Sequence, residues 1–169
     1  MRDLLEQIER GLDQNLYYLA LFAALSLPDI CGALDSDDGE ADRSKYISWF
    51  DEYVGDGYKS GTQAFLSGDD CYYFRCGILH QGSSHNPKSG YSRILFVEPG
   101  ATTNVFHCNI MNDALNIDVR IFCKDIINGV RVWLGKVEGT TKFSSNMAKF
   151  IRRYPRGLSP YIGGIPVIG

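Results

Sequence analysis

The chain contains 169 residues, of which 44% are hydrophobic, 22% charged and 12% aromatic. This balance is typical of one folded domain, and a chain of this size can bury about 70% of its surface without disulfides or a structural metal. The 17 basic and 20 acidic residues leave a net charge of −3. This charge excludes a protein that binds nucleic acid simply because it is a polycation.

The sequence contains five cysteines, an odd number, and no Cys-x-x-Cys pair. Reduced thiols and no bound metal are therefore expected. No apolar run approaches the roughly 20 residues that cross a membrane, and Asp3, Glu6 and Glu9 interrupt the N-terminus where a signal peptide would be apolar. We expect a cytoplasmic protein with no cofactor and no membrane contact.

The first part of the chain predicts two helices separated by a loop. Apolar residues recur at three- and four-residue spacing over 2–27, which predicts a long first helix that stops at Pro28. Residues 28–42 contain proline, glycine and an acidic cluster, so they predict a loop. A second helix is predicted over 43–54, with an N-cap at the end of that loop.

A short, unusually aromatic third helix is predicted over 71–80, because Ser67 and the acidic residues after it are typical of a helix start. Beyond it lie two runs of β-branched and aromatic residues, 94–97 and 105–110, around a Pro-Gly turn. They predict a small β-hairpin within residues 91–111.

Helical spacing returns over 114–134 and predicts a long fourth helix, followed by a shorter one over 144–154. The tail at 157–169 is too rich in proline and glycine for a helix and is expected to pack in an extended form. The sequence thus predicts a single, mainly α domain over 1–169. It is a bundle of four to five helices with a β-hairpin inserted before the fourth helix.

Two polar residues, Arg75 and His80, interrupt the otherwise apolar third helix. Five residues of helix give about 7.5 Å of rise and ~140° of rotation, so the two side chains meet only if the long arginine bends toward the histidine. If they meet, they suit metal-free cleavage of RNA. A histidine can move the protons, and a guanidinium can hold the phosphate with two hydrogen bonds.

Composition and spacing alone favour a structural interpretation of the two residues. Arg75 could pair with Asp69 or Asp70, and His80 could donate to a carbonyl oxygen at its own helix end, where a cation is favoured. Two common residues at one fixed spacing are not by themselves specific.

The nine residues Phe74-Arg-Cys-Gly-Ile-Leu-His-Gln-Gly82 resemble the Arg-x4-His motif of the HEPN superfamily (higher eukaryote and prokaryote nucleotide-binding domains), and in particular its small stand-alone prokaryotic members. The resemblance implies an all-α bundle and a homodimer whose two motifs line a shared cleft. It also implies a metal-independent endoribonuclease that acts as a toxin or phage-defence effector, with an antitoxin or another regulatory protein as a partner. Arg75 and His80 would be its catalytic pair.

Further residues receive supporting roles. Asp69 and Asp70 could orient Arg75, and Tyr72 could stack on an RNA base. Cys76 stands where active members of the superfamily often carry a polar residue, and it could pack as a small hydrophobe. Three arginines would contact phosphates if RNA crosses the last helix: Arg152, Arg153 and Arg156.

The leading hypothesis is therefore an endoribonuclease in which the 2′-oxygen attacks the phosphate and leaves a 2′,3′-cyclic phosphate and a 5′-hydroxyl. The alternative is a catalytically inactive HEPN-like module that binds a nucleotide or a partner protein in a defence or regulatory system. A third possibility is a purely structural interaction protein. It would have no effect on RNA.

Overall fold

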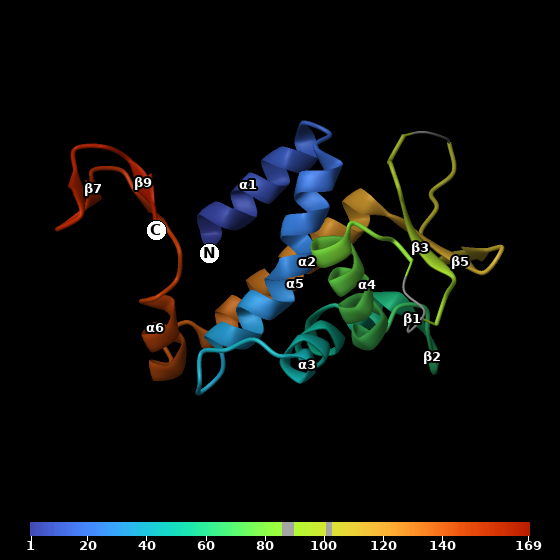
Figure 1. The fold of residues 1–169 in the computed structure, drawn as a ribbon. Coiled ribbons are helices and arrows are strands. Elements are labelled where there is room, and N and C mark those ends of the chain that lie inside the picture. Colours follow the sequence, from blue (N-terminus) through green and yellow to red (C-terminus); the bar gives the residue numbers. More distant parts are fainter. Residues whose placement is uncertain (86–89, 101–102) are drawn as a thin grey trace.

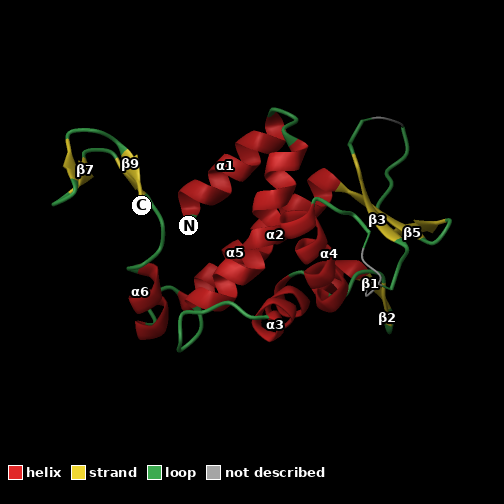
Figure 2. Ribbon diagram, viewed as in Figure 1, coloured by secondary structure: helices red, strands yellow, loops and turns green. Residues whose placement is uncertain are grey.

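The computed structural model describes residues 1–85, 90–100 and 103–169 and confirms that the chain is mainly α-helical (Figures 1 and 2). The helices within these ranges are α1 (Arg2–Asp13), α2 (Tyr17–Leu34), α3 (Arg43–Tyr53), α4 (Gly68–Gln81), α5 (Val119–Val137) and α6 (Thr141–Met147). A short 3-10 helix (Gly55–Tyr58) follows α3. The strands are β1 (Lys59–Ser60), β2 (Gln63–Ala64), β3 (Arg93–Val97), β4 (Asn109–Met111), β5 (Ala114–Asp118), β6 (Arg153–Tyr154), β7 (Gly157–Leu158), β8 (Ile162–Gly163) and β9 (Val167–Ile168).

Helices α2 and α5 pack against each other through the centre of the molecule (Figure 1). Helix α1 packs on both of them, α3 packs on α2 and α5, and α4 is held mainly by α3 and α2. The core between these helices is closed by large, fully buried side chains, among them Tyr46, Phe50, Phe122 and Trp133. This arrangement places α4 beside both α2 and α3.

Two of the predicted helix starts are confirmed by their capping bonds. The Asp42 side chain accepts a hydrogen bond from the backbone N–H of Lys45 at the start of α3. At the start of α4, Ser67 and Asp70 form a capping box, in which each side chain bonds the backbone of the other residue. These bonds satisfy N–H groups that would otherwise lack a partner in the first turn.

The single helix predicted over 2–27 is wrong, because the chain breaks between α1 and α2. Asn15 adopts a positive φ of 58°, a conformation that asparagine tolerates better than most residues, and it lets α2 fold back against α1. Pro28 does not end the helix but lies buried inside α2, which continues to Leu34. Burial of the residues that follow, such as Cys31, outweighs the lost backbone hydrogen bond. The loop predicted over 28–42 is correspondingly shorter.

The two runs predicted as a hairpin do not pair with each other. Instead β3 pairs in parallel with β5, and β4 pairs antiparallel with the other edge of β5. The tight turn is at Asn112 and Asp113, which both have positive φ, whereas the predicted Pro-Gly turn extends to Ala101, outside the described residues.

The fourth predicted helix therefore starts later than expected, at Val119. Residues 114–118 form the central strand β5, and all five are buried. Asp118 ends this strand and caps α5 by accepting a hydrogen bond from the N–H of Ile121. A short run buried on both faces has no alternating pattern, so periodicity cannot distinguish it from the first turn of a helix.

The C-terminal segment departs from the prediction of a helix over 144–154. Helix α6 ends at Met147, and residues 151–169, here called the arm, form two short strand pairs, β6 with β9 and β7 with β8. No described residue after Phe150 packs on the hydrophobic core. The tail is thus extended but does not pack as expected: the arm projects from the body, and Ile151 and Ile168 are exposed (Figure 1).

Among the described residues, α2 alone is long and apolar enough to meet the length and composition of a membrane span. Half of this helix is buried inside the fold. A core helix meets the same criteria, and the contacts of α2 with α1, α3 and α5 are those of a core helix.

Candidate functional site

Arg75 and His80 meet in the C-terminal half of α4. Arg75 Nη1 lies 3.1 Å from His80 Nε2, although the two residues do not share one face of the helix. The contact forms because the arginine side chain bends along the helix, and His80 is exposed in the last turn, before Gly82 ends α4 in a left-handed conformation. A guanidinium can only donate, so His80 Nε2 acts as the acceptor in this contact.

Asp29, on the neighbouring helix α2, is the third residue of the site, beside Arg75 and His80. Its carboxylate oxygen Oδ2 forms an ion pair with Arg75 Nη2, and the two side chains are only 12% and 19% exposed. Helical spacing did not point to this residue, because a helix that stops at Pro28 leaves Asp29 in a loop. A usable signal was present, since Asp29 is the single charged residue between Tyr17 and Leu34.

Burial governs the electrostatics of this ion pair. Burial raises the pKa of Asp29 above its ordinary value, and the positive charge of Arg75 offsets this effect only in part. Burial also opposes the charge of Arg75, but Asp29 and Cys76 outweigh it and raise the pKa of the guanidinium. Burial thus opposes the charged form of both groups, and their mutual attraction favours it, in a site with little access to water.

The contact between Asp29 and Arg75 is ionic rather than a well-aligned hydrogen bond. Within the described part of the chain, Asp29 Oδ2 and Arg75 Nε are both buried without a partner of good hydrogen-bond geometry. Arg75 Nη2 nevertheless approaches Asp29 Oδ2 closely enough to form the ion pair. The pair is therefore an electrostatic contact, and one guanidinium donor, Arg75 Nε, has no acceptor among the described residues.

Cys76 and Tyr72 both contact the same guanidinium. Arg75 Nη1 donates to Cys76 Sγ at 3.7 Å, and the guanidinium carbon lies 5.8 Å from the centre of the Tyr72 ring. The Tyr72 ring packs edge-on against Tyr46 of α3. Arg75 is thus held by α2 on one side and by its own helix on the other.

Asp69 and Asp70 do not reach Arg75. Asp69 forms an ion pair with Arg43 of α3 at 2.5 Å. The Asp70 carboxylate accepts a hydrogen bond from the Ser67 hydroxyl at 2.6 Å and another from the N–H of Gly90. The structure gives these two residues positions in the α3–α4 contact and the helix cap, and Asp29 occupies the position expected of them.

Arg152, Arg153 and Arg156 lie in or beside the short strands of the arm, on the opposite side of the molecule from α4 (Figure 1). Arg152 Nε donates to the hydroxyl of Tyr154 at 2.9 Å. Within one chain these arginines therefore do not line the same site as Arg75 and His80.

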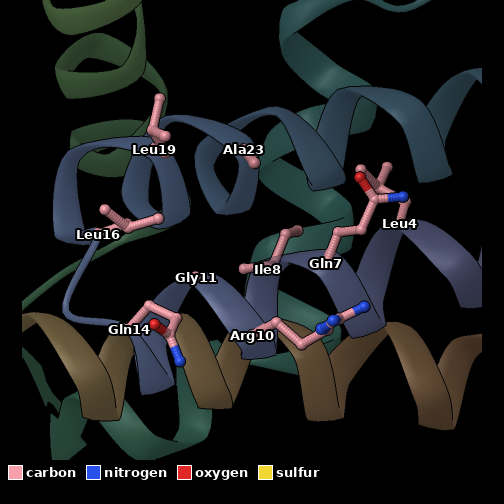
Figure 3. A pocket seen from close by; sticks show the side chains of 9 residues that line it. All are labelled: Leu4, Gln7, Ile8, Arg10, Gly11, Gln14, Leu16, Leu19 and Ala23. Atoms are coloured by element: carbon pink, nitrogen blue, oxygen red, sulfur yellow. The ribbon is translucent and has the colours of Figure 1, made fainter.

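Two other features lie away from the pair. A groove of about 400 Å³ between α1 and α2 has an apolar wall that includes Ile8, Leu16 and Leu19 (Figure 3). Near the sheet, the Tyr58 hydroxyl donates to Asp125 Oδ2 at 3.0 Å, and the His107 ring packs edge-on against Tyr58.

The described residues contain no cluster of three or more His, Cys, Asp or Glu side chains that could hold a metal ion.

Comparison with family models, curated proteins and solved structures finds no match for this chain. The functional assignment therefore rests on the chemistry of the site and on the resemblance of residues 74–82.

Proposed function

We propose that the protein is a metal-independent endoribonuclease of HEPN type, a cytoplasmic homodimer that acts as a toxin or phage-defence effector. The observation that carries this proposal is the 3.1 Å contact between Arg75 Nη1 and His80 Nε2. The proposed cleavage requires the two side chains to meet. A five-residue spacing does not bring them together by helix geometry alone, so the contact depends on the conformation of the arginine side chain.

In the proposed reaction, a phosphate of the RNA takes the place of His80 beside Arg75 Nη1, and the guanidinium binds its oxygens. Neutral His80, released from this contact, accepts the proton of the 2′-hydroxyl through Nε2. The 2′-oxygen then bonds to phosphorus, and the bond from phosphorus to the 5′-oxygen breaks. The 5′-oxygen leaves with a proton, so the products are a 2′,3′-cyclic phosphate and a 5′-hydroxyl.

The departing 5′-oxygen needs a proton donor, and among the described residues of one chain His80 is the one imidazole in contact with Arg75. A second copy related by a two-fold axis would supply its own His80 as the acid. Four exposed apolar side chains at the N-terminal end of α2, here called the patch on α2, support this arrangement. They are the N-cap residue Leu16 and, within the helix, Tyr18, Leu19 and Phe22, which are between 38% and 78% exposed. The patch lies on the same helix as Asp29.

A second function is favoured by the burial of Arg75. Its guanidinium is already paired with Asp29, and Cys76 occupies a position that is often polar in active members of the superfamily. On this alternative the ion pair mainly joins α2 to α4, and the protein is a catalytically inactive module that binds a nucleotide or a regulatory protein.

Cleavage of total cellular RNA in excess chelator distinguishes the two functions. The wild type, Arg75→Ala and His80→Ala are compared, with His85→Ala as the matched control, because His85 follows the same helix but bonds the carbonyl oxygen of Ser92. The endoribonuclease proposal expects cleavage with cyclic phosphate ends by the wild type and the control only. A folded wild type that leaves RNA intact, or cleavage that the chelator abolishes, would contradict it.

A further inference from the structure

Asp29 differs from every other acidic residue considered for this site. It lies on α2, whereas Arg75 and His80 lie on α4, so the ion pair joins two helices. It is also the one charged residue of α2, in a helix that otherwise supplies apolar side chains to the core. A buried charge on such a helix is costly unless it is paired, and its partner here is the proposed phosphate-binding group.

We propose that Asp29 is the positioning residue of this site: its carboxylate anchors Arg75 Nη2 so that Nη1 faces His80 Nε2. The catalytic consequence rests on the proposed endoribonuclease function, but the geometric claim does not. Asp29 is not a catalytic residue, because its side chain is nearly buried and contacts the guanidinium rather than the place where RNA would react.

The atoms of the guanidinium support this division of roles. Nη2 contacts Asp29, and Nη1 contacts His80 and Cys76. Nε has no hydrogen-bond partner among the described residues, so nothing at that end of the group fixes its orientation. Asp29 is thus the single carboxylate in the described part of the chain with an ion pair to Arg75.

The two acidic residues nearest to Arg75 in the sequence cannot take over the role of Asp29. Asp69 is bound to Arg43 and Asp70 to the cap of α4, so neither can replace Asp29 without breaking contacts of its own. A long arginine side chain without its anchor samples several rotamers, and the contact with a histidine five residues away is then lost for most of the time.

The test uses Asp29→Asn, which keeps the shape of the side chain but removes its charge. Its matched control is Glu9→Gln, because Glu9 and Arg131 form an exposed ion pair between α1 and α5, away from the site. The first measurement is the nitrogen NMR spectrum of the His80 ring at pH 8. We expect Nε2 to be the unprotonated nitrogen in the wild type and the control, and the two tautomers to mix in Asp29→Asn.

The second measurement is RNA cleavage. We expect Asp29→Asn to lower kcat by about tenfold or more and to change KM by less than about threefold, as loss of a supporting group does. Asp29→Glu keeps the charge and should retain both the wild-type tautomer and part of the activity. If Asp29→Asn does not fold, Asp29→Ser removes the charge with a smaller side chain and should show the same mixing of tautomers. A folded neutral variant that keeps the wild-type tautomer would overturn the proposal.

The two proposals fail in different ways. A wild type that does not cleave RNA contradicts the proposed function, while the tautomer of His80 still reports whether Asp29 positions Arg75. If the wild type cleaves RNA and Asp29→Asn keeps both its rate and its tautomer, the positioning role is overturned and the endoribonuclease stands. A changed tautomer in Glu9→Gln would also overturn it, because any lost ion pair would then suffice.

Discussion

Asp29 and Arg75 join the C-terminal third of α2 to α4 through a nearly buried ion pair. Such a pair adds little net stability, but removal of one partner leaves the other charge buried and unpaired. We expect Arg75→Met to lower the free energy of unfolding by about 2 kcal/mol, and Asp29→Asn combined with Arg75→Met to cost less than the sum of the single changes. Urea unfolding of the three variants measures this coupling, and simple additivity would contradict it.

Two glycines inside helices should respond in opposite ways to alanine. A Cβ on Gly68 would lie 2.7 Å from the carbonyl oxygen of Ile47, at the place where α4 meets α3, whereas a Cβ on Gly135 in α5 meets no atom within 4 Å. We expect Gly68→Ala to destabilise the protein by about 2 kcal/mol and Gly135→Ala to stabilise it by roughly 0.5–1 kcal/mol. Thermal unfolding measures both, and equal shifts would contradict the close contact of α3 and α4.

His107 should make stability depend on pH. Burial lowers the pKa of His107 below its ordinary value, and the charges of Asp125 and Asp118 offset this effect only in part. As the pH falls below about 6.5, the unfolded chain takes up a proton that folded His107 resists, so this contribution is complete above that pH and lost below it.

The variant His107→Phe keeps an aromatic ring beside Tyr58 but cannot titrate. We expect its free energy of unfolding to fall less than that of the wild type between pH 7.5 and pH 5. An equal fall in both proteins would show that His107 does not carry the effect.

The exposed patch on α2 should control assembly if a second copy covers it. We expect Leu19→Glu to weaken a homodimer by at least tenfold in dissociation constant, because it places a charge in a desolvated interface. The control is Val132→Glu on α5, another exposed apolar position, at 59% exposure. Analytical ultracentrifugation measures both, and a Leu19→Glu protein that dimerises like the wild type would exclude this patch as the interface.

We expect the three arginines of the arm to contribute to RNA binding through their charge alone. Replacing Arg152, Arg153 and Arg156 with alanine removes three cations from a segment that does not pack on the core. We expect unchanged thermal unfolding, weaker RNA binding across sequences, and a slope of log affinity against log salt that is smaller by about 2. An unchanged slope would remove these residues from the RNA-binding surface.

Some features of this protein were predictable from local signals in the sequence. The caps at Asp42 and Ser67, the helical class of the chain and an extended C-terminus follow from interactions within a few residues, which the sequence alone specifies. The pair Arg75 and His80 was also visible, as two polar residues in an apolar helix. Whether they meet depends on one rotamer, which spacing does not determine.

Tertiary packing decided the rest. Pro28 stays inside α2 because neighbouring helices bury the segment, and 114–118 becomes a strand because β3 and β4 pair on both of its edges. Asp29 enters the site for the same reason: a helix that continues past the proline carries it to Arg75, 46 residues away in sequence. Contacts between distant residues depend on how elements pack, and a pattern read along the chain contains no record of that packing.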